Sequence, residues 1–330
     1  MYEAFYQLKK NPFEITPDPS FLFATEKHNE ALATLYYGVR RHKGFVVLTG
    51  EVGTGKTLLL RCLLQILRLS DVHHAYVFNS RLGPMEFLQY VVADFGLPVS
   101  PNNKSELLLT LSRFVISRFK KRLTTVLVID EAHHLTEDVL EEIRLLTNLE
   151  TANQKLLQIL LVGQPELDEK LDSINLRQLK QRIAVRAQLS PLEPEETAGY
   201  VRSRLQVAGN TTPDNVFPIE TLMEIHRHSR GIPRLINTLC ENALIHGYGR
   251  QTARITPAII EEIAMDFRLS VVNSRPKTEI TASGKPSSDV EDAAKTLLDL
   301  YSSLRRAQST RERLRGTVEK VGARDNEPYI

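Results

Sequence analysis

One short stretch of this chain has the residue types needed to hold a row of phosphate groups. It begins at Gly50, directly after an apolar run, and ends where a helical pattern starts. Its glycines let the backbone turn N–H groups inward, and the helix N-terminus adds the positive end of a dipole. The spacing G-x-x-x-x-G-K-T therefore predicts a polyphosphate site formed by Gly50, Glu51, Val52, Gly53, Thr54, Gly55, Lys56, Thr57 and Leu58.

Two side chains of this loop have distinct chemistry. Lys56 can bring its positive charge to the β and γ phosphates of a nucleotide, and the Thr57 hydroxyl can ligate Mg²⁺. The alternative is a glycine-rich turn that only joins a strand to a helix. The filled lysine and threonine positions and the strand–loop–helix context argue against it.

A second motif supplies what hydrolysis needs. The apolar run Thr125–Ile129 ends in Asp130 and Glu131. We expect Asp130 to hold Mg²⁺ through its waters and Glu131 to orient and polarise the attacking water. The alternative is a strand that ends in ordinary surface acids. Together the two motifs predict an enzyme that hydrolyses a nucleoside triphosphate with the help of Mg²⁺.

The residues Asp130-Glu-Ala-His133 also match the DEAH box of one helicase class. Those helicases need two tandem nucleotide-binding cores and further motifs. After Leu189 this chain has only helical patterns, so the helicase interpretation is set aside.

The elements that must position these residues alternate between short apolar runs and amphipathic stretches. This alternation predicts an α/β fold of the P-loop NTPase type, a five-stranded parallel sheet flanked by helices. The predicted strands are Phe45–Thr49, Ala75–Asn79, Thr125–Ile129, Leu156–Val162 and Ile183–Leu189. The predicted helices between them are Lys56–Leu69, Pro84–Phe95, Ser105–Lys120 and Glu137–Glu150, with Thr136 as the N-cap of the last.

Beyond the fifth strand the sequence changes character twice. Four helical patterns follow, at Glu195–Ala208, Ile219–Ser229, Pro233–Gly247 and Pro257–Arg268, and they predict a small all-helical lid domain. A polar, aperiodic linker and an amphipathic helical tail come after them. The predicted organisation is an N-terminal segment (1–43) that packs on the ATPase core, a nucleotide-binding domain (44–191), the lid domain (192–268), the linker (269–288) and the tail (289–330).

Composition excludes some classes of protein. The 42 basic and 40 acidic residues leave a net charge of +2, which argues against a chain that coats nucleic acid over its whole surface. No apolar run reaches the roughly 18–20 residues of a membrane span, and the first residues lack a secretory signal. We therefore expect a cytoplasmic protein without an integral membrane segment. Cys62 and Cys240 lie in apolar helical patterns and are expected to be buried free thiols.

At this level of detail the chain resembles the AAA+ ATPases, in particular the ExeA or general-secretion-pathway-A type. The resemblance covers about residues 1–268. It rests on motifs that are more specific in combination than singly: Tyr2-Glu-Ala-Phe-Tyr6, Asn11-Pro-Phe13, Thr16-Pro-Asp-Pro19, the stretch Gly44 to Thr57, Val162-Gly-Gln-Pro-Glu-Leu167, Leu176 to Ile183, and Gly231-Ile-Pro-Arg234.

The resemblance implies roles for further residues. Gln164 matches sensor 1, which contacts the γ-phosphate or the attacking water, and Asn79 matches the polar switch residue that engages the catalytic glutamate. Arg182 matches the arginine finger that reaches into a neighbouring subunit's site, with Arg177 as its rival. Arg234 matches sensor 2, which reaches the nucleotide from the lid.

A finger that acts in trans predicts ATP-dependent self-assembly, into a ring or a short filament. The N-terminal Phe13 and Phe21 fit two interpretations equally, packing near the adenine or simple core packing.

Two functions compete for this chain. The first is an assembly or regulatory motor of an envelope secretion, pilus or polysaccharide export system. It would act through protein partners, one docked on the tail, and a partner would recruit it to the inner face of the membrane. The secretion type continues into a membrane span and a peptidoglycan-binding part, whereas here the ATPase is followed by the linker and tail.

The alternative is an ATP-dependent regulator that polymerises on duplex DNA, as transposition AAA+ proteins do. Near-neutral charge favours the first function mildly. Two basic clusters keep the second open: residues 40–43, and Arg113, Arg118, Lys120, Lys121 and Arg122.

Overall fold

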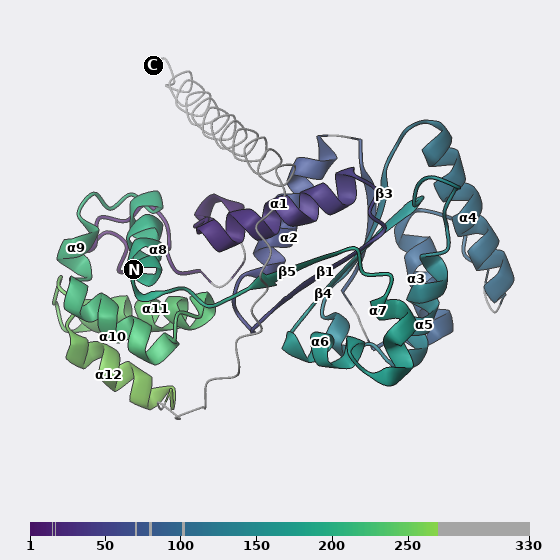
Figure 1. Ribbon diagram of the computed structural model, residues 1–330. Coiled ribbons are helices and arrows are strands. Elements are labelled where there is room, and N and C mark those ends of the chain that lie inside the picture. Colours follow the sequence, from purple (N-terminus) through teal and green to yellow (C-terminus); the bar gives the residue numbers. More distant parts are fainter. Residues whose placement is uncertain (15, 17, 70, 79–80, 101–102, 270–330) are drawn as a thin grey trace, which may run out of the picture.

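The protein is described by a computed structural model that covers residues 1–14, 16, 18–69, 71–78, 81–100 and 103–269. Within these ranges the chain forms an α/β part and a group of helices beside it (Figure 1). The predicted tail, nearly all of the predicted linker and Asn79 lie outside the described residues.

A five-stranded, fully parallel sheet forms the centre of the α/β part, which confirms the predicted fold class. The strands are β1 (Phe45–Gly50), β2 (His73–Val77), β3 (Thr125–Ile129), β4 (Leu157–Gly163) and β5 (Val185–Leu189). Their order across the sheet is β2-β3-β4-β1-β5. The ends of β1, β3 and β4 therefore lie next to one another, which is where the phosphate loop, the two carboxylates and Gln164 follow in sequence.

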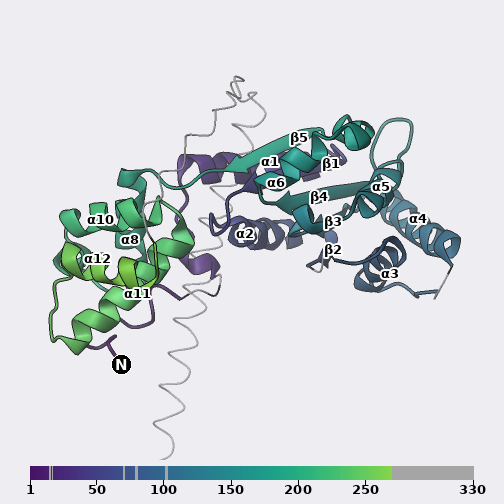
Figure 2. The ribbon, with the colours of Figure 1, turned by 90° about the horizontal axis from the view of Figure 1, so that it is seen from below.

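Helices cover both faces of this sheet (Figure 2). Alternate strand residues point to opposite faces. Val46 and Leu48 pack with α1 (Glu26–Arg40) and α2 (Lys56–Arg68). Phe45 and Val47 pack on the other face, in a core to which three further helices contribute: α3 (Pro84–Asp94), α4 (Lys104–Lys120) and α5 (Glu137–Leu146). All of these strand residues are buried, as expected for a parallel sheet between two helical layers.

Some boundaries differ from the predicted ones. Helix α5 begins at the predicted cap, where the Thr136 side chain accepts a hydrogen bond from the Val139 N–H, but it ends at Leu146 rather than Glu150. Threonine and asparagine at positions 147 and 148 are weak helix formers. Past them, Glu150 forms a short antiparallel bridge with Lys155 and leads the chain into β4.

The hydrophobic periodicity of the sequence did not predict three helices of the α/β part. Helix α1 lies in the segment preceding β1, where the Thr25 hydroxyl caps it by accepting from the His28 N–H. Helices α6 (Pro165–Leu171) and α7 (Arg177–Lys180) are too short to show a clear period.

The second group of helices follows β5 and has its own hydrophobic core. Its members are α8 (Pro194–Val207), α9 (Pro213–Val216), α10 (Ile219–Ser229), α11 (Pro233–Gly249) and α12 (Pro257–Asp266). We call residues 192–268 the helical region. In both ribbon views it lies to one side of the sheet (Figures 1 and 2).

The N-terminal residues are divided between the two parts of the fold. Only α1 packs against the sheet, whereas Tyr2, Tyr6, Leu8, Phe13 and Phe21 are buried in the core of the helical region. The first half of the segment 1–43 therefore packs with the helical region, and its second half packs with the sheet. Aromatic side chains become buried wherever apolar surface is available. The sequence alone did not indicate whether these residues would pack against the sheet or in the helical region.

Two further features concern buried thiols and membrane spans. Cys62 and Cys240 are free and fully buried, as predicted, and burial raises the pKa of the Cys62 thiol to about 12. Among the described residues, no helix combines the length and the apolar character needed to cross a membrane.

Candidate nucleotide-binding site

The phosphate loop joins β1 to α2 through glycines that no other residue type could easily replace. Gly55 is the N-cap of α2 with φ of 99°, and Gly53 has φ of 82°. Side chains strongly disfavour such positive φ values. The loop therefore ends in the exposed N–H groups of the first turn of α2, a ready site for an anion.

Lys56 is held inside this loop. Its Nζ donates hydrogen bonds to the backbone oxygens of Gly50, at 2.7 Å, and Glu51, at 2.9 Å. Burial lowers the pKa of Lys56, and the nearby carboxylates of Glu131 and Asp130 oppose that shift. The ammonium group is thus positioned among the loop backbone and two carboxylates, where a phosphate chain would pass.

Asp130 lies across from the loop and is fixed by three donors. The Thr57 hydroxyl is 3.3 Å from its Oδ2, and the Tyr76 hydroxyl donates to the same oxygen at 2.6 Å. The backbone N–H of Glu131 donates to Oδ1 at 2.9 Å. Burial and the Asp130 carboxylate raise the pKa of Tyr76, so its hydroxyl stays protonated as a donor. Sequence analysis did not single out Tyr76, because it reads there as an ordinary strand residue.

Glu131 sits in an uncommon backbone conformation at the end of β3. Its φ of 52° places a non-glycine residue in the left-handed region, just before the short 3₁₀ turn Ala132–His134. Residues held in such conformations cluster at functional sites. The turn carries the Glu131 side chain to the same cavity as Lys56.

Gln164 follows β4 and lies beside this turn. Its backbone N–H points to Nδ1 of His133 at 3.4 Å, and its side chain lines the cavity. The two turns approach closely, because a Cβ on Gly163 would lie 3.3 Å from the backbone nitrogen of His133. Glycine at position 163 therefore allows the end of β4 to lie against the end of β3.

The helical region meets the phosphate loop at the start of α11. The backbone N–H of Arg234 donates to the Gly53 oxygen at 3.2 Å, and a Cβ on Gly53 would lie 2.7 Å from the Arg234 Cβ. Pro233 occupies the first turn of α11, where its missing N–H costs nothing. The loop and the helical region are thus in direct backbone contact.

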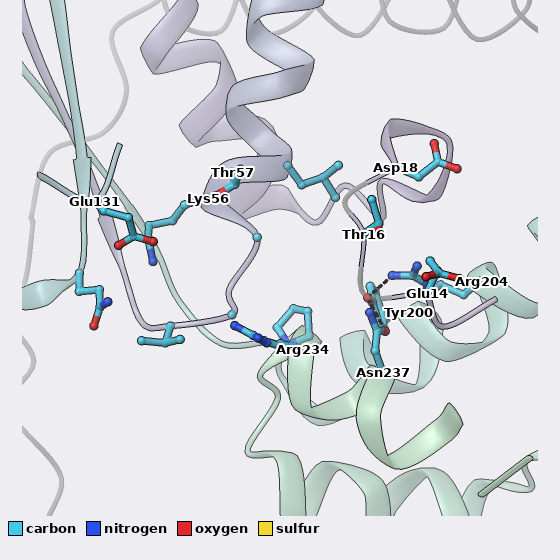
Figure 3. A pocket seen from close by; sticks show the side chains of 16 residues that line it. Glu14, Thr16, Asp18, Lys56, Thr57, Glu131, Tyr200, Arg204, Arg234 and Asn237 are labelled. Atoms are coloured by element: carbon cyan, nitrogen blue, oxygen red, sulfur yellow. Dashed lines mark hydrogen bonds between the residues drawn. The ribbon is translucent and has the colours of Figure 1, made fainter. Parts of the chain in front are cut away.

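A cavity of about 330 Å³ joins these parts. This volume falls at the lower end of the range for small-ligand pockets. Figure 3 shows Lys56 and Glu131 at one end, Tyr200, Arg204 and Asn237 at the other, and Arg234 between them. The predicted residues that line it are Val52, Gly53, Gly55, Lys56, Thr57, Leu58, Glu131, Gln164 and Arg234.

The end of the cavity away from the phosphate loop is polar and was not predicted. The Tyr200 hydroxyl donates to the Asn237 side-chain oxygen at 2.8 Å, and Arg204 donates to the Tyr200 hydroxyl at 2.6 Å. Glu14, Thr16 and Asp18 also line the cavity. In sequence, Tyr200 and Arg204 are one helical turn apart in an ordinary amphipathic pattern, so no local signal marks them.

The N-terminal aromatics belong to the core rather than to this cavity. Phe13 packs edge-to-face on Phe217, with ring centroids 6.1 Å apart, and is 1% exposed. Phe21 lies under the Arg204 guanidinium, 4.6 Å from ring centroid to Cζ. Neither ring lines the cavity. Of the two interpretations, core packing therefore holds for both.

The two candidate finger arginines lie elsewhere. Arg177 begins α7 and is exposed, and Arg182 follows that helix just before β5 and is half-buried. Of the residues that the structure describes, those that line the cavity do not include either arginine.

These features define a class of protein. Residues 39–171 match the family model of an AAA domain. With the parallel sheet, the phosphate loop and the two carboxylates, this part of the chain is an AAA domain with the P-loop NTPase fold.

The resemblance to the secretion type is also confirmed. The chain is 46% identical over 256 residues to general secretion pathway protein A of Aeromonas hydrophila. The aligned stretch covers 77% of this chain and 46% of the relative. The chain thus spans less than half the length of that relative.

Solved structures give the same fold at low identity. The Aeropyrum pernix ORC2 protein, solved with ADPNP and ADP, has a TM-score of 0.59 at 17% identity, over 78% of this chain and 72% of that one. Cdc6p from Pyrobaculum aerophilum has a TM-score of 0.61 at 15% identity, over 92% and 89%. A Drosophila ORC structure bound to DNA has a TM-score of 0.60 at 17% identity, over 82% and 66%.

Proposed function

We propose that this protein hydrolyses ATP and works as an oligomeric assembly or regulatory motor of an envelope secretion, pilus or polysaccharide export system. One observation carries the ATPase part. Lys56, Thr57, Glu131, Gln164 and Arg234 come from four separate places in the sequence and line one cavity. In this proposal residues 44–191 bind the nucleotide and residues 192–268 act as its lid.

The proposed ATP pose follows the long axis of the cavity. The phosphates lie on the loop backbone from Gly50 to Thr57, near Lys56 and Arg234, and the base lies toward Tyr200 and Asn237. Thr57 and Asp130 would hold Mg²⁺, because their oxygens are the hard ligands that this ion prefers. It would supply charge neutralisation on the phosphates. The Tyr76 hydroxyl keeps the Asp130 carboxylate oriented for that role.

Hydrolysis in this proposal depends on Glu131 as the group that orients and polarises water. Gln164 lines the same cavity and would contact the γ-phosphate or that water. Asn79, the candidate switch residue, keeps the role that the family resemblance implies.

Self-assembly follows from the arginines outside the cavity. Arg182, or its rival Arg177, would complete a neighbour's site, where a cation stabilises charge on the transferring phosphoryl group. Their absence from the described lining of their own cavity is consistent with action in trans.

The envelope role rests on the similarity to general secretion pathway protein A. The tail would dock a protein partner and so bring a cytoplasmic ATPase to the inner face of the membrane. Duplex DNA remains the competing partner, but the structure weakens one of its two basic clusters. Arg118 donates to the backbone oxygens of Asp71 and Thr124 and to the Thr125 hydroxyl, so its guanidinium has a structural role.

The ATPase proposal is tested by comparing the full chain with Glu131→Gln. The wild type is expected to release phosphate from ATP. The variant should bind ATP with similar affinity and lose about 10²- to 10⁴-fold in turnover, the contribution of a positioned base. A variant that turns over at the normal rate would remove Glu131 from its assigned role.

A second experiment separates the two biological roles. Glu131→Gln replaces the native copy in cells, and protein export, piliation and polysaccharide export are each measured. Loss of one of them at normal protein level supports the envelope role. Normal export, combined with an ATPase that duplex DNA stimulates in a steeply salt-dependent way, would contradict it.

A further inference from the structure

The side chain of His133 lies against the carboxylate of Glu131. Its Nδ1 is 3.5 Å from Glu131 Oε2, and the imidazole is 7% exposed. Oε2 itself is buried, and no group among the described residues donates a hydrogen bond to it. The Glu131 side chain as a whole is 47% exposed. One oxygen of the proposed base is therefore enclosed next to the imidazole, while the rest of the side chain is open.

The same imidazole nitrogen also faces the turn after β4. The backbone N–H of Gln164 points at Nδ1 of His133 from 3.4 Å. Lys170 of α6 stabilises the turn that carries His133, because its Nζ donates to the backbone oxygens of His133 and Leu135, both at 2.7 Å. His133 is thus a physical link between the glutamate and the sensor turn.

One ring nitrogen cannot satisfy both neighbours at once. A bare Nδ1 accepts from the Gln164 N–H but offers nothing to the carboxylate, whereas a protonated Nδ1 donates to Oε2 but leaves the Gln164 N–H unpaired. A change of tautomer is enough to move between the two states, so the ring can stay neutral. The two states therefore differ in whether Glu131 is held or released.

We propose that His133 is a positioning residue that couples the sensor turn to the proposed base. When Nδ1 accepts from the Gln164 N–H, Glu131 is free to turn toward the nucleotide, and when Nδ1 donates to Oε2, Glu131 is held back. Nucleotide bound near Gln164 favours the first state. The role in turnover rests on the proposed ATPase function, but the tautomer change can be observed without turnover.

The kinetic test uses the full chain and three variants. His133→Leu removes the nitrogen, and His133→Asn places an amide near the position of Nδ1. His134→Leu is the matched control, because His134 is the exposed neighbour in the same turn. Because His133→Leu leaves the Gln164 N–H without its acceptor, the sensor turn is no longer fixed in the active arrangement, and kcat should fall about tenfold or more, within the roughly 10²- to 10⁴-fold that general acid–base catalysis contributes. KM and the affinity for a non-hydrolysable ATP analogue should change less than about twofold, and His133→Asn should recover most of the loss.

Three kinetic results would overturn the proposal. The first is a His133→Leu variant with unchanged kcat. The second is a loss of kcat matched by equal losses of nucleotide affinity and thermal stability, which would make His133 a packing residue. The third is a His133→Asn variant as impaired as His133→Leu.

A spectroscopic test does not depend on turnover. In protein labelled with ¹⁵N-histidine, the Nδ1 resonance of His133, assigned by its loss in His133→Asn, should move to the bare-nitrogen range when the ATP analogue binds. An Nδ1 whose protonation does not change on binding would overturn the coupling. A wild type that shows this change but releases no phosphate would instead contradict the ATPase proposal.

Discussion

At the residue scale, this site depends on side chains that are enclosed and given a single set of partners. Lys56 is 7% exposed and held by two backbone oxygens, and Asp130 is held by Thr57 and Tyr76. Preorganised charges of this kind act strongly because little water screens them. Single substitutions should therefore have large and separable effects.

The clearest effect is expected for Lys56→Ala. Removing the ammonium group deletes charge-assisted hydrogen bonds to phosphate, each of which contributes about 1.5–3 kcal/mol. Binding of an ATP analogue, measured by calorimetry, should weaken by about two orders of magnitude. Lys121→Ala, at an exposed position after α4, is the matched control and should bind normally. Equal affinity of Lys56→Ala and wild type would mean that phosphate binds elsewhere.

At the element scale, the contacts of the phosphate loop with α1 and the helical region decide whether the site forms. One close approach lies within the helical region, next to the turn that leads to Arg234, and the other joins α1 to the loop. Gly231 sits beneath Leu192, and the buried His28 of α1 reaches the oxygen of Thr54. Each gives a prediction.

Gly231→Ala should destabilise the helical region where the backbone at Leu192 packs against the turn before α11. A Cβ at this position would lie 1.9 Å from the Leu192 oxygen, and Gly231 has φ of +71°. The clash and the strained φ together should lower the free energy of unfolding by about 2 kcal/mol or more. Gly96→Ala controls for φ alone, because Gly96 has φ of +72° and no heavy atom near its would-be Cβ. Denaturant melts that give the same loss for both variants would contradict the clash.

His28 should make stability depend on pH. Its Nδ1 is 2.7 Å from the Thr25 hydroxyl oxygen, and its Nε2 is 3.4 Å from the Thr54 oxygen. Burial lowers the pKa of His28 below its ordinary 6.5, an effect that the Thr54 oxygen and Glu196 partly oppose.

As the pH falls through 6.5, the unfolded chain therefore binds a proton at His28 that the folded chain does not. Protons then favour unfolding, and this part of the stability is lost toward lower pH. Between pH 8 and pH 5 the wild type should lose more stability than His28→Gln, whose amide can still donate to Thr54. Parallel pH profiles for the two proteins would show that the imidazole is not the cause.

At the scale of the whole molecule, the described cavity lacks the arginine that the family resemblance implies. Arg177 and Arg182 lie beyond α6, whereas the cavity lies between the phosphate loop and the helical region. If one of them completes a neighbour's site, activity must depend on the assembly rather than on a single chain.

A mixing experiment tests this dependence. Arg182→Ala should bind ATP but provide no finger, and Lys56→Ala should provide a finger but bind no ATP. Each alone is expected to be inactive. Their mixture should recover part of the ATPase activity, because a Lys56→Ala subunit can complete the site of its Arg182→Ala neighbour. The same mixture made with Arg177→Ala decides between the two arginines. No recovery in either mixture would contradict a finger in trans.

Much of this protein was determined by local sequence. The glycines, lysine and threonine of residues 50–57 require a phosphate loop, and the apolar runs require a buried parallel sheet, because period and residue type act over short distances. The strand order then brings the ends of β1, β3 and β4 together. This agrees with the prediction that the motifs after these strands form one site. Helix α5 began at its predicted cap, Thr136.

Only the tertiary structure decided which surfaces meet. The aromatic residues near the N-terminus are buried in the helical region rather than on the sheet. Tyr200, Arg204 and Asn237 line the end of the cavity away from the phosphate loop. Tyr76 of β2 contacts Asp130 at the end of β3, and His133 after β3 contacts Gln164 after β4. Such contacts join residues tens to hundreds of positions apart, so they depend on packing between elements and leave no periodic signal along the chain.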